Sequence, residues 1–399
     1  MHTVGIPQHP VPTTDRSFRE LGLSQPIVAA VEKIGFVNPT PIQAAVIPTA
    51  LSGKDVIGLA QTGSGKTAAF ALPIAERLTH GNGVRALILS PTREIALQTK
   101  AFLDIFGAEH NLSTACLIGG VKMKPQTDAL KKTPDILVAT PGRLLDHVNR
   151  RAVSLDAIEQ LVLDEADHML DLGFLPQMRD ILRRLPRERQ TMMFSATMPD
   201  TIEMIAKDFM RDPVRVDITP QGAAEGISHR LYVVKMEDKR PALLALLLQE
   251  LGSTLVFTRR KMDADWLYHI LQRQGHPVTR MHSDLSQGKR VQSLERFRTG
   301  SHRILVATDI AGRGIDVPGI EHVINFDIPE TVEDYIHRGG RTARGAAQGI
   351  VSTIATWQDL PMVKQIETTL GEKIPRCSVG SIEPWVELEK KPSRERRRV

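Results

Sequence analysis

Cysteine and aromatic residues are scarce in this sequence of 399 residues. Its two cysteines, Cys116 and Cys377, do not have metal-ligand spacing and are too few for a disulfide framework. We expect both to be reduced, buried thiols, which favours a cytoplasmic location. Aromatic residues make up 4% of the chain, so stacking of bases on aromatic rings is not expected to dominate the recognition of any nucleic acid.

Long apolar runs are also absent from the sequence. The richest uncharged stretch, Ala242–Leu248, is far shorter than the roughly 20 residues that a membrane-spanning helix needs. The first residues are rich in histidine and proline and do not show the charged-then-apolar pattern of a secretory leader. We therefore expect no association with a membrane.

Charge of one sign is confined to the end of the chain. The formal net charge is +5, from 51 Lys and Arg against 46 Asp and Glu. The last ten residues contain six basic residues and one acidic residue, which accounts for the whole excess. Residues 1–389 are therefore formally neutral, and any site for a polyanion there has to be a local patch. The segment Lys390–Val399 forms a separate basic arm.

Short apolar runs alternate with stretches of helical periodicity along the chain. This alternation predicts parallel α/β units, and runs that are apolar on both faces need helices above and below the sheet. The expected fold class is α/β, with two doubly wound parallel sheets. The expected strands are Val56–Leu59, Ala86–Leu89, Ile136–Ala139, Leu161–Leu163, Thr191–Phe194, Leu231–Val234, Thr254–Phe257, Val278–Met281, Ile304–Ala307, His322–Asn325 and Ile350–Ile354; helical periodicity is clearest in Pro26–Ile34, Thr67–Leu78, Ile95–Phe106 and Asp263–Gln272.

The length suits two domains of about 150–200 residues each. Between them, Arg211–Ser228 contains Pro213, Pro220, Gly222 and Gly226 with little periodicity, which predicts a linker. The expected division is an extension at 1–17, a first domain at 18–212, a linker at 213–228, a second domain at 229–375 and a basic tail at 376–399. Within the tail, Ser381–Leu388 is a candidate for a short docked segment around Trp385, and Lys390–Val399 is expected to be disordered.

A glycine-rich segment follows the first apolar run and precedes a helical stretch, which is the context of a phosphate-binding loop. Gly63 and Gly65 allow backbone N–H groups to converge on phosphate oxygens, Lys66 would reach the β- and γ-phosphates, and Thr67 would bind Mg²⁺. The alternative is a glycine-rich turn with a solvated lysine. The segment consists of Ala60, Gln61, Thr62, Gly63, Ser64, Gly65, Lys66 and Thr67.

Acidic residues follow a second apolar run, Leu161–Leu163. Asp164 would lie beside the Mg²⁺ ion, and Glu165 would orient and deprotonate the attacking water. An isolated acidic cluster at a strand end is more often a helix cap or a solvated turn. Together with the phosphate-binding loop, it indicates an ATPase site instead.

The sequence Asp164-Glu165-Ala166-Asp167 resembles the motif that gives DEAD-box RNA helicases their name, and the resemblance extends from about Phe18 to Arg344. Gly35–Gln43 is similar to the Q motif of that family, with Phe18 as the aromatic residue that precedes it. The resemblance implies that Phe36 stacks on adenine, that the Gln43 amide pairs with its edge, and that Phe18 also belongs to the ATP-binding residues. Such contacts would make the enzyme specific for ATP.

Further segments resemble motifs of the same family in the same order. Pro91–Gln98 is similar to motif Ia, Gly119-Gly120 to the GG element and Thr140–Arg143 to motif Ib. Glycine N–H groups and Thr or Arg side chains suit phosphate and ribose oxygens, so recognition is expected to be independent of base sequence. Taken alone, each is a common turn or cap. The implied RNA contacts in the first half are Thr92, Arg93, Gly119, Gly120, Thr140 and Arg143.

Ser195–Thr197 resembles motif III, which links the hydrolysis site to the domain interface; a plain strand-end cap is the alternative. In the second half, Leu255–Phe257, Val306–Asp316 and Tyr335–Arg344 resemble motifs IV, V and VI. An arginine-rich segment such as the last can also be a surface salt-bridge or phosphate patch. The resemblance implies that Gln287, Arg290 and Thr308 contact RNA, that Asp316 lies near the ATP ribose, that Arg341 and Arg344 are arginine fingers, and that Asp167, Ser195, Thr197, His337 and Arg338 couple the sites.

Three positions differ from the usual pattern of the family: Gly312 and Gly339 replace larger residues, and Ser283 replaces glycine. None removes a charged group, although Gly339 adds backbone freedom close to Arg341.

The resemblance implies two tandem RecA-like domains, ATP and Mg²⁺ as cofactors, and single-stranded or short duplex RNA as the partner. The expected activity is ATP-dependent unwinding or remodelling of RNA and RNA–protein complexes. An ATP-gated RNA clamp with little unwinding, and a DNA helicase with a similar core, are the alternatives. Similarity to bacterial RhlE-like members suggests a role in ribosomal or RNA-decay complexes.

Overall fold

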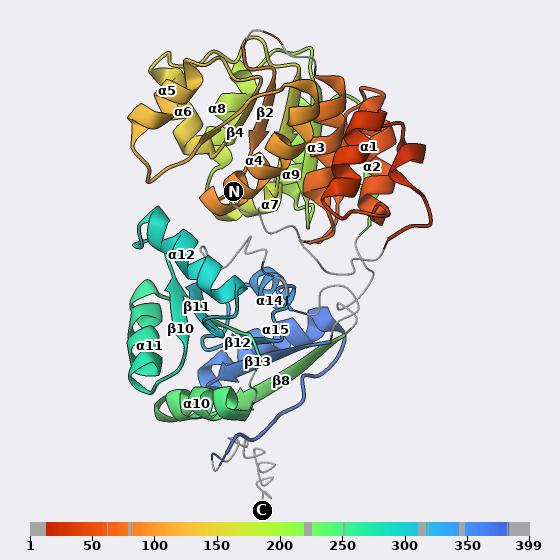
Figure 1. Ribbon diagram of the computed structural model, residues 1–399. Helices are drawn as coiled ribbons and strands as arrows, with labels where there is room; N and C mark the ends of the chain where they lie inside the picture. Colours follow the sequence, from red (N-terminus) through yellow and green to blue (C-terminus); the bar gives the residue numbers. More distant parts are fainter. Residues whose placement is uncertain are drawn as a thin grey trace, which may run out of the picture.

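Two α/β domains follow one another along the chain (Figure 1). The computed structural model describes residues 13–61, 63–78, 81, 83–218, 226–249, 252–309, 317, 319–342, 348–380 and 382. Among these residues, no helix has the length and apolar character needed to cross a membrane. In Figure 1, α12 and α14 of the second domain face α4 and α7 of the first.

The first domain is built on a parallel sheet of seven strands, in the order β3-β4-β2-β5-β6-β1-β7. Most of these strands are short runs of Val, Ile and Leu that are buried on both faces, as the sequence pattern predicted. The strands are β1 (Val56–Leu59), β2 (Ala86–Leu89), β3 (Thr114–Leu117), β4 (Ile136–Ala139), β5 (Gln160–Leu163), β6 (Gln190–Ser195) and β7 (Val214–Asp217).

Helices cover both faces of this sheet. On one face Ile27, Ile47 and Phe70 belong to a continuous apolar cluster, and on the other face Met178 and Ile202 belong to a second. The helical elements are η1 (Phe18–Leu21), α1 (Gln25–Lys33), α2 (Pro41–Leu51), α3 (Lys66–Arg77), α4 (Arg93–Gly107), η2 (Ala108–His110), α5 (Met123–Leu130), α6 (Pro141–Asn149), α7 (Ala166–Asp171), α8 (Leu175–Arg184) and α9 (Asp200–Phe209).

The second domain repeats this architecture with a parallel sheet of six strands, in the order β10-β11-β9-β12-β13-β8. Helices α10 and α11 cover one face, and α12, α14 and α15 cover the other. Its elements are β8 (Ile227–Val233), η3 (Met236–Asp238), α10 (Lys239–Gln249), β9 (Thr254–Thr258), α11 (Lys261–Arg273), β10 (Val278–Met281), α12 (Gln287–Arg298), β11 (Ile304–Thr308), β12 (His322–Asn325), α14 (Val332–Gly339), β13 (Gly349–Ala355), η4 (Trp357–Asp359) and α15 (Leu360–Leu370).

Every strand that the sequence predicted is present, but two further strands were missed. One of them corrects the expected linker, because Val214–Asp217 is the edge strand β7 and pairs with β1. The Asp55 carboxylate accepts hydrogen bonds from the backbone N–H groups of Arg211 and Thr191, both at 2.7 Å, and so fixes the entry to this strand. At the other end, β8 already begins at Ile227, so the connection between the domains is shorter than 213–228.

The start of the expected tail also needs correction. The N–H group of Cys377 donates to the Leu231 carbonyl at 2.8 Å, and Val379 is 1% exposed in the core of the second domain. Residues 376–380 therefore belong to this domain. The two cysteines are partly exposed rather than buried. Trp385 and Lys390–Val399 lie outside the described residues, as does most of Ser381–Leu388.

Candidate active site and RNA interface

The parallel strands of the first sheet bring the predicted motifs to one edge. Gly119-Gly120, Thr140 and Thr92 follow β3, β4 and β2, which are neighbours in the sheet. Asp164 follows β5, Ser195 ends β6 and the glycine-rich loop follows β1. The carboxyl ends of parallel strands form the usual ligand site of such sheets. The predicted RNA contacts thus occupy one half of the edge and the predicted nucleotide contacts the other half.

The glycine-rich loop has the backbone that a phosphate site requires. Gly63 and Gly65 adopt positive φ angles of 87° and 94°, and α3 begins directly after them at Lys66. The positive φ of Gly65 favours glycine, and a Cβ atom there would displace the side-chain nitrogen of Gln43. Lys66 is 6% exposed, and its Nζ donates to the Ala60 carbonyl at 2.6 Å. Thr62 lies outside the described residues.

Gln43 connects the segment that resembles the Q motif to this loop. Its Oε1 accepts the N–H of Thr40 at 3.0 Å, and its Nε2 donates to the Gly65 carbonyl at 3.1 Å. Phe36 is partly exposed, whereas Phe18 is 3% exposed and stacks on Phe36 at 6.5 Å between ring centroids. Phe18 thus lies in the core behind Phe36, and the direct contact with adenine that the sequence suggested fits Phe36 better.

The acidic motif lies at the centre of the sheet edge. Burial and the neighbouring Glu165 charge raise the pKa of Asp164, which is 3% exposed. Burial also acts to raise the pKa of Glu165, but the hydrogen bond and charge of His168, with smaller effects of Lys66 and Arg341, outweigh it and lower that pKa. Glu165 therefore stays ionised and is able to accept a hydrogen bond from water.

His168 is a site residue that the sequence did not reveal. Its Nδ1 lies 3.0 Å from Oε2 of Glu165, and the ring is 4% exposed. The only sequence signal is its position three residues after Glu165, the N-cap of α7, which brings the two side chains together across the first turn of that helix. The contact fixes the orientation of the carboxylate.

Asp167 joins the acidic motif to Ser195–Thr197. Its Oδ2 accepts hydrogen bonds from the Thr197 hydroxyl at 3.0 Å and from the N–H groups of Ala196 and Thr197 at 3.0 and 2.9 Å. The Ser195 hydroxyl in turn accepts the N–H of Asp167 at 3.2 Å. The acidic motif and Ser195–Thr197 are therefore joined directly.

The residues fit a magnesium ion that is shared with a nucleotide. No group of three or more His, Cys, Asp or Glu side chains in the part of the chain that the structure describes forms a protein-only metal site. Mg²⁺ is commonly held by one or two protein oxygens and substrate phosphates. Asp164 is buried beside a second carboxylate, Glu165, and close to Lys66. A cation bound there would neutralise the charge of the two carboxylates. Thr67 and Asp164 are the residues that would hold it.

On the RNA side, the structure brings Arg93 together with the two glycines. The Arg93 guanidinium lies so close to Gly120 that a Cβ atom there would collide with it, and it is also the nearest group to Gly119. Arg143 donates to the Val121 carbonyl at 2.9 Å, next to the same turn. Thr92 and Thr140 occupy the N-cap positions of α4 and α6, where their helix ends face the sheet edge.

Gln287 and Arg290, which were expected to contact RNA, bind Glu94 of the first domain. The Gln287 Nε2 donates to Glu94 Oε1 at 3.0 Å, and an Arg290 Nη donates to Glu94 Oε2 at 2.8 Å. The charged side chains are 8% and 7% exposed. Glu94 was not predicted as a site residue, although it follows Arg93 directly. This contact joins α4 to α12 across the domain interface.

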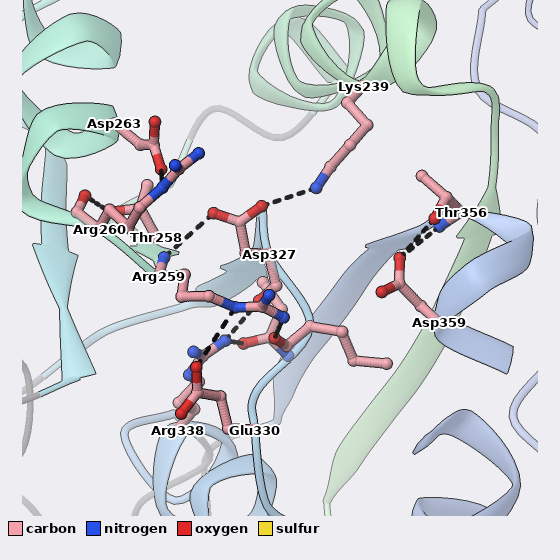
Figure 2. A network of polar contacts seen from close by, with 12 residues as sticks. Lys239, Thr258, Arg259, Arg260, Asp263, Asp327, Glu330, Arg338, Thr356 and Asp359 are labelled. Carbon is pink, nitrogen blue, oxygen red and sulfur yellow. Dashed lines mark hydrogen bonds and ion pairs between the residues drawn. The ribbon is translucent and has the colours of Figure 1, made fainter. Parts of the chain in front are cut away.

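Arg338, which was predicted to couple the sites, contacts residues of its own domain, and Figure 2 shows it within a network of polar contacts. Its guanidinium is 2% exposed and donates to both carboxylate oxygens of Asp309, at 2.5 and 2.7 Å, and to Asn325 at 3.0 Å. It also donates to the Asp327 carbonyl at 2.7 Å. All these partners belong to the second domain, so Arg338 joins Asp309, which directly follows β11, to the end of β12.

The same end of β12 is fixed to α10 and β9 by Asp327 (Figure 2). The Asp327 carboxylate accepts a hydrogen bond from Lys239 at 2.7 Å and one from the backbone N–H of Arg259 at 3.0 Å. Burial acts to raise the pKa of Asp327, but these groups outweigh it and lower that pKa. Thr308, which ends β11, is 9% exposed at this edge. The second sheet therefore presents a rigid edge toward the first domain.

Arg341 brings the second domain to the hydrolysis site. It is 4% exposed, its Nε donates to the His337 carbonyl at 3.2 Å, and its charge contributes to the lowered pKa of Glu165. Arg344, Asp316 and Gly312 lie outside the described residues.

Comparisons with known proteins agree with this geometry. The family model for the DEAD/DEAH box helicase matches residues 40–205, and that for the helicase conserved C-terminal domain matches residues 238–346. The DEAD-box ATP-dependent RNA helicase CshA of Geobacillus kaustophilus is 42% identical over 374 residues, which cover 93% of this chain and 80% of the relative. The chain belongs to the DEAD-box ATP-dependent RNA helicase family. CshA of Bacillus subtilis is 40% identical, with 96% of this chain and 78% of the relative covered.

Solved structures of related helicases are similar to this chain to different extents. Dbp5 of S. cerevisiae bound to RNA and ADP BeF3 gives a TM-score of 0.82 at 29% identity, with 90% of this chain and 95% of that chain covered. A DEAD box protein from Methanococcus jannaschii is 37% identical but gives a TM-score of 0.53, with 91% of this chain and 99% of that chain covered.

The helicase uses ATP with Mg²⁺ and acts on RNA. Of the more detailed expectations, the RhlE-like subgroup is not confirmed, since the relatives described above are CshA proteins.

Proposed function

We propose that the helicase hydrolyses ATP only while ATP and RNA hold its two domains together. The observation that carries this proposal is the division of charged groups between the domains. Lys66, Asp164 and Glu165 belong to the first domain, and Arg341, whose charge acts on Glu165, belongs to the second. Neither domain has the complete set, so turnover depends on closure.

In the closed state each residue has a separate task. Lys66 binds the β- and γ-phosphates, and Thr67 and Asp164 hold Mg²⁺, which neutralises phosphate charge when bound. Glu165, oriented by His168, positions the attacking water and accepts its proton. Arg341 stabilises charge on the transferred phosphoryl group, and we assign the same task to Arg344. Asp167, Ser195 and Thr197 transmit the state of the acidic motif to the interface.

We further propose that RNA lies across both domains along the edge that contains Arg93, Gly119, Gly120 and Arg143 on the first and Thr308 on the second. These groups suit phosphate and ribose oxygens, so binding is independent of base sequence and selects RNA through its 2′-hydroxyls and shape. A single strand bent to fit both domains is incompatible with a regular duplex. Closure on a short duplex therefore opens it locally, and hydrolysis followed by phosphate release resets the enzyme.

Two variants test this mechanism. Glu165→Gln should retain ATP and RNA binding and lose turnover, because the amide keeps the shape of the carboxylate and cannot accept a proton. Lys66→Ala should lose both ATP binding and unwinding, because its contacts with the phosphates are made in the ground state as well. Steady-state ATPase and duplex-separation assays measure both. Equal ATPase rates of the unmodified enzyme with and without RNA would show that closure is not coupled to hydrolysis.

For the cellular role we propose the cytoplasm and ribosomal or RNA-decay complexes. Two cysteines that are both free thiols in the structure support a reducing compartment. Crosslinking of the helicase to RNA in its source cell, followed by sequencing, identifies the bound transcripts. Recovery of neither ribosomal nor decaying RNA would rule out this assignment.

A further inference from the structure

A hollow of about 500 Å³ lies on the second domain beside α10 and α11. These two helices cover the face of the sheet opposite to α12, α14 and α15. None of the residues that line the hollow belongs to the nucleotide site or to the RNA edge described above. They are Arg240, Trp266, His269, Ile270, Arg273 and Gln274.

The hollow has an excess of positive charge. Arg240 and Arg273 are both exposed, and neither forms an ion pair with any residue that the structure describes. The carboxylates of α11 are already neutralised, since Asp263 binds Arg260 at 3.0 Å and Asp265 binds Arg280 at 2.9 Å. An anionic ligand would therefore meet two guanidinium groups without a competing carboxylate.

The hollow also offers a flat aromatic surface, which is rare in this chain. The Trp266 side chain is 46% exposed, and the Arg240 guanidinium lies over one face of its ring, 5.8 Å from the ring centre, which leaves the other face for a base. A ring that stacks on a base, next to cations that contact phosphates, is the combination used by proteins that bind single-stranded nucleic acid. An acidic peptide would satisfy the arginines but would leave the ring without a stacking partner.

We propose that this hollow is a second binding site for single-stranded RNA, in which a base stacks on Trp266 and the adjoining phosphates contact Arg240 and Arg273. The inference rests on the proposed function, because RNA held between the domains would provide the strand whose continuation reaches this face. The site would give long RNA an advantage over an oligonucleotide that fills only the interdomain site.

The experiment compares two uridine oligonucleotides with the full-length protein in the presence of a non-hydrolysable ATP analogue. One is about 8 nucleotides long, within the range of a single site, and the other is about 40 nucleotides long. Affinity is measured for Trp266→Ala and for the double variant Arg240→Ala with Arg273→Ala. Matched controls are Trp357→Ala, which removes a tryptophan that is 60% exposed outside the hollow, and Lys364→Ala with Lys373→Ala, which removes two charges from other exposed positions.

We expect Trp266→Ala to weaken binding of the long oligonucleotide by roughly tenfold, as for the loss of one base stack. The double arginine variant should reduce the slope of log affinity against log salt by about 1.4, as for two phosphate contacts on a single strand. Affinity for the short oligonucleotide and the ATPase rate that it stimulates should not change in either variant, which separates this inference from the proposed function.

Two results would overturn the inference. One is an unchanged affinity for long RNA in both variants. If this result were found, a loss of Trp266 fluorescence in the unmodified protein on addition of poly-glutamate, but not of RNA, would assign the hollow to an acidic peptide. The other is an equal loss in the lysine and tryptophan controls, which would reduce the effect to general surface charge.

Discussion

The contact of Glu94 with Arg290 gives a quantitative prediction about domain closure. Glu94→Gln keeps the shape of the side chain and one acceptor oxygen, which can face Arg290 in place of Gln287, but it leaves Arg290 without an opposite charge. Both charged side chains are less than one-tenth exposed, at 8% and 7%, so solvent screens their interaction weakly. The Arg290 charge also acts on nearby Arg93, whose pKa is lowered by burial and by this repulsion.

Truncation of one partner in a buried, hydrogen-bonded ion pair typically costs about 2–5 kcal/mol. The lower end, about 2 kcal/mol, applies here because the glutamine amide still accepts a hydrogen bond from Arg290. This cost falls on the closed state alone, since the pair spans the two domains, and it corresponds to roughly a 30-fold smaller closed population. RNA binding opposes this loss, so the RNA concentration that gives half-maximal ATPase activity should rise by roughly 30-fold while the saturated rate is retained.

The assay is RNA-stimulated ATPase activity as a function of RNA concentration. Glu109→Gln is the control, because Glu109 is an exposed carboxylate on the first domain. A double-mutant cycle with Arg290→Gln should give a coupling energy of about 1–3 kcal/mol. If the two changes were simply additive, Arg290 would act on RNA independently of Glu94, and the interdomain role assigned here would be refuted.

Three further predictions concern other parts of the molecule. His168→Ala should lower the saturated ATPase rate by about 10- to 100-fold without changing the KM for ATP, as is typical when the partner that orients a catalytic group is lost. His168→Asn should restore part of the rate. The control His147→Ala, which removes a buried histidine elsewhere in the first domain, should retain the full rate. Gly339→Ala should raise the free energy of unfolding by about 0.5–1 kcal/mol in denaturant titration, because alanine restricts the unfolded backbone more than glycine does. Gly339 is the last residue of α14, and an added Cβ would meet Val351 at 3.7 Å, which is an ordinary contact. A lower stability would show that the glycine is required. Deletion of Lys390–Val399 should weaken RNA binding and flatten its salt dependence with saturated ATP turnover intact, and an unaltered salt slope would limit this segment to solubility.

The sequence alone determined the fold class, the strands and the chemistry of the site. Apolar runs such as Val56–Leu59 are buried on both faces, so composition is sufficient to identify them. The exceptions have physical causes. β3 and β7 form the two edges of the first sheet, and burial alternates along each of them, so neither stands out as an apolar run.

Only the tertiary structure decided which side chains meet. Glu94 and Arg290 are far apart in the chain, and no local pattern indicates that they form an ion pair between the domains. Arg338 was assigned to a coupling role from its position in the segment that resembles motif VI, yet its partners are Asp309 and Asn325 of its own domain. A residue type records which bonds a side chain is able to form, whereas the choice among possible partners depends on distances that exist only after both sheets have formed and come together.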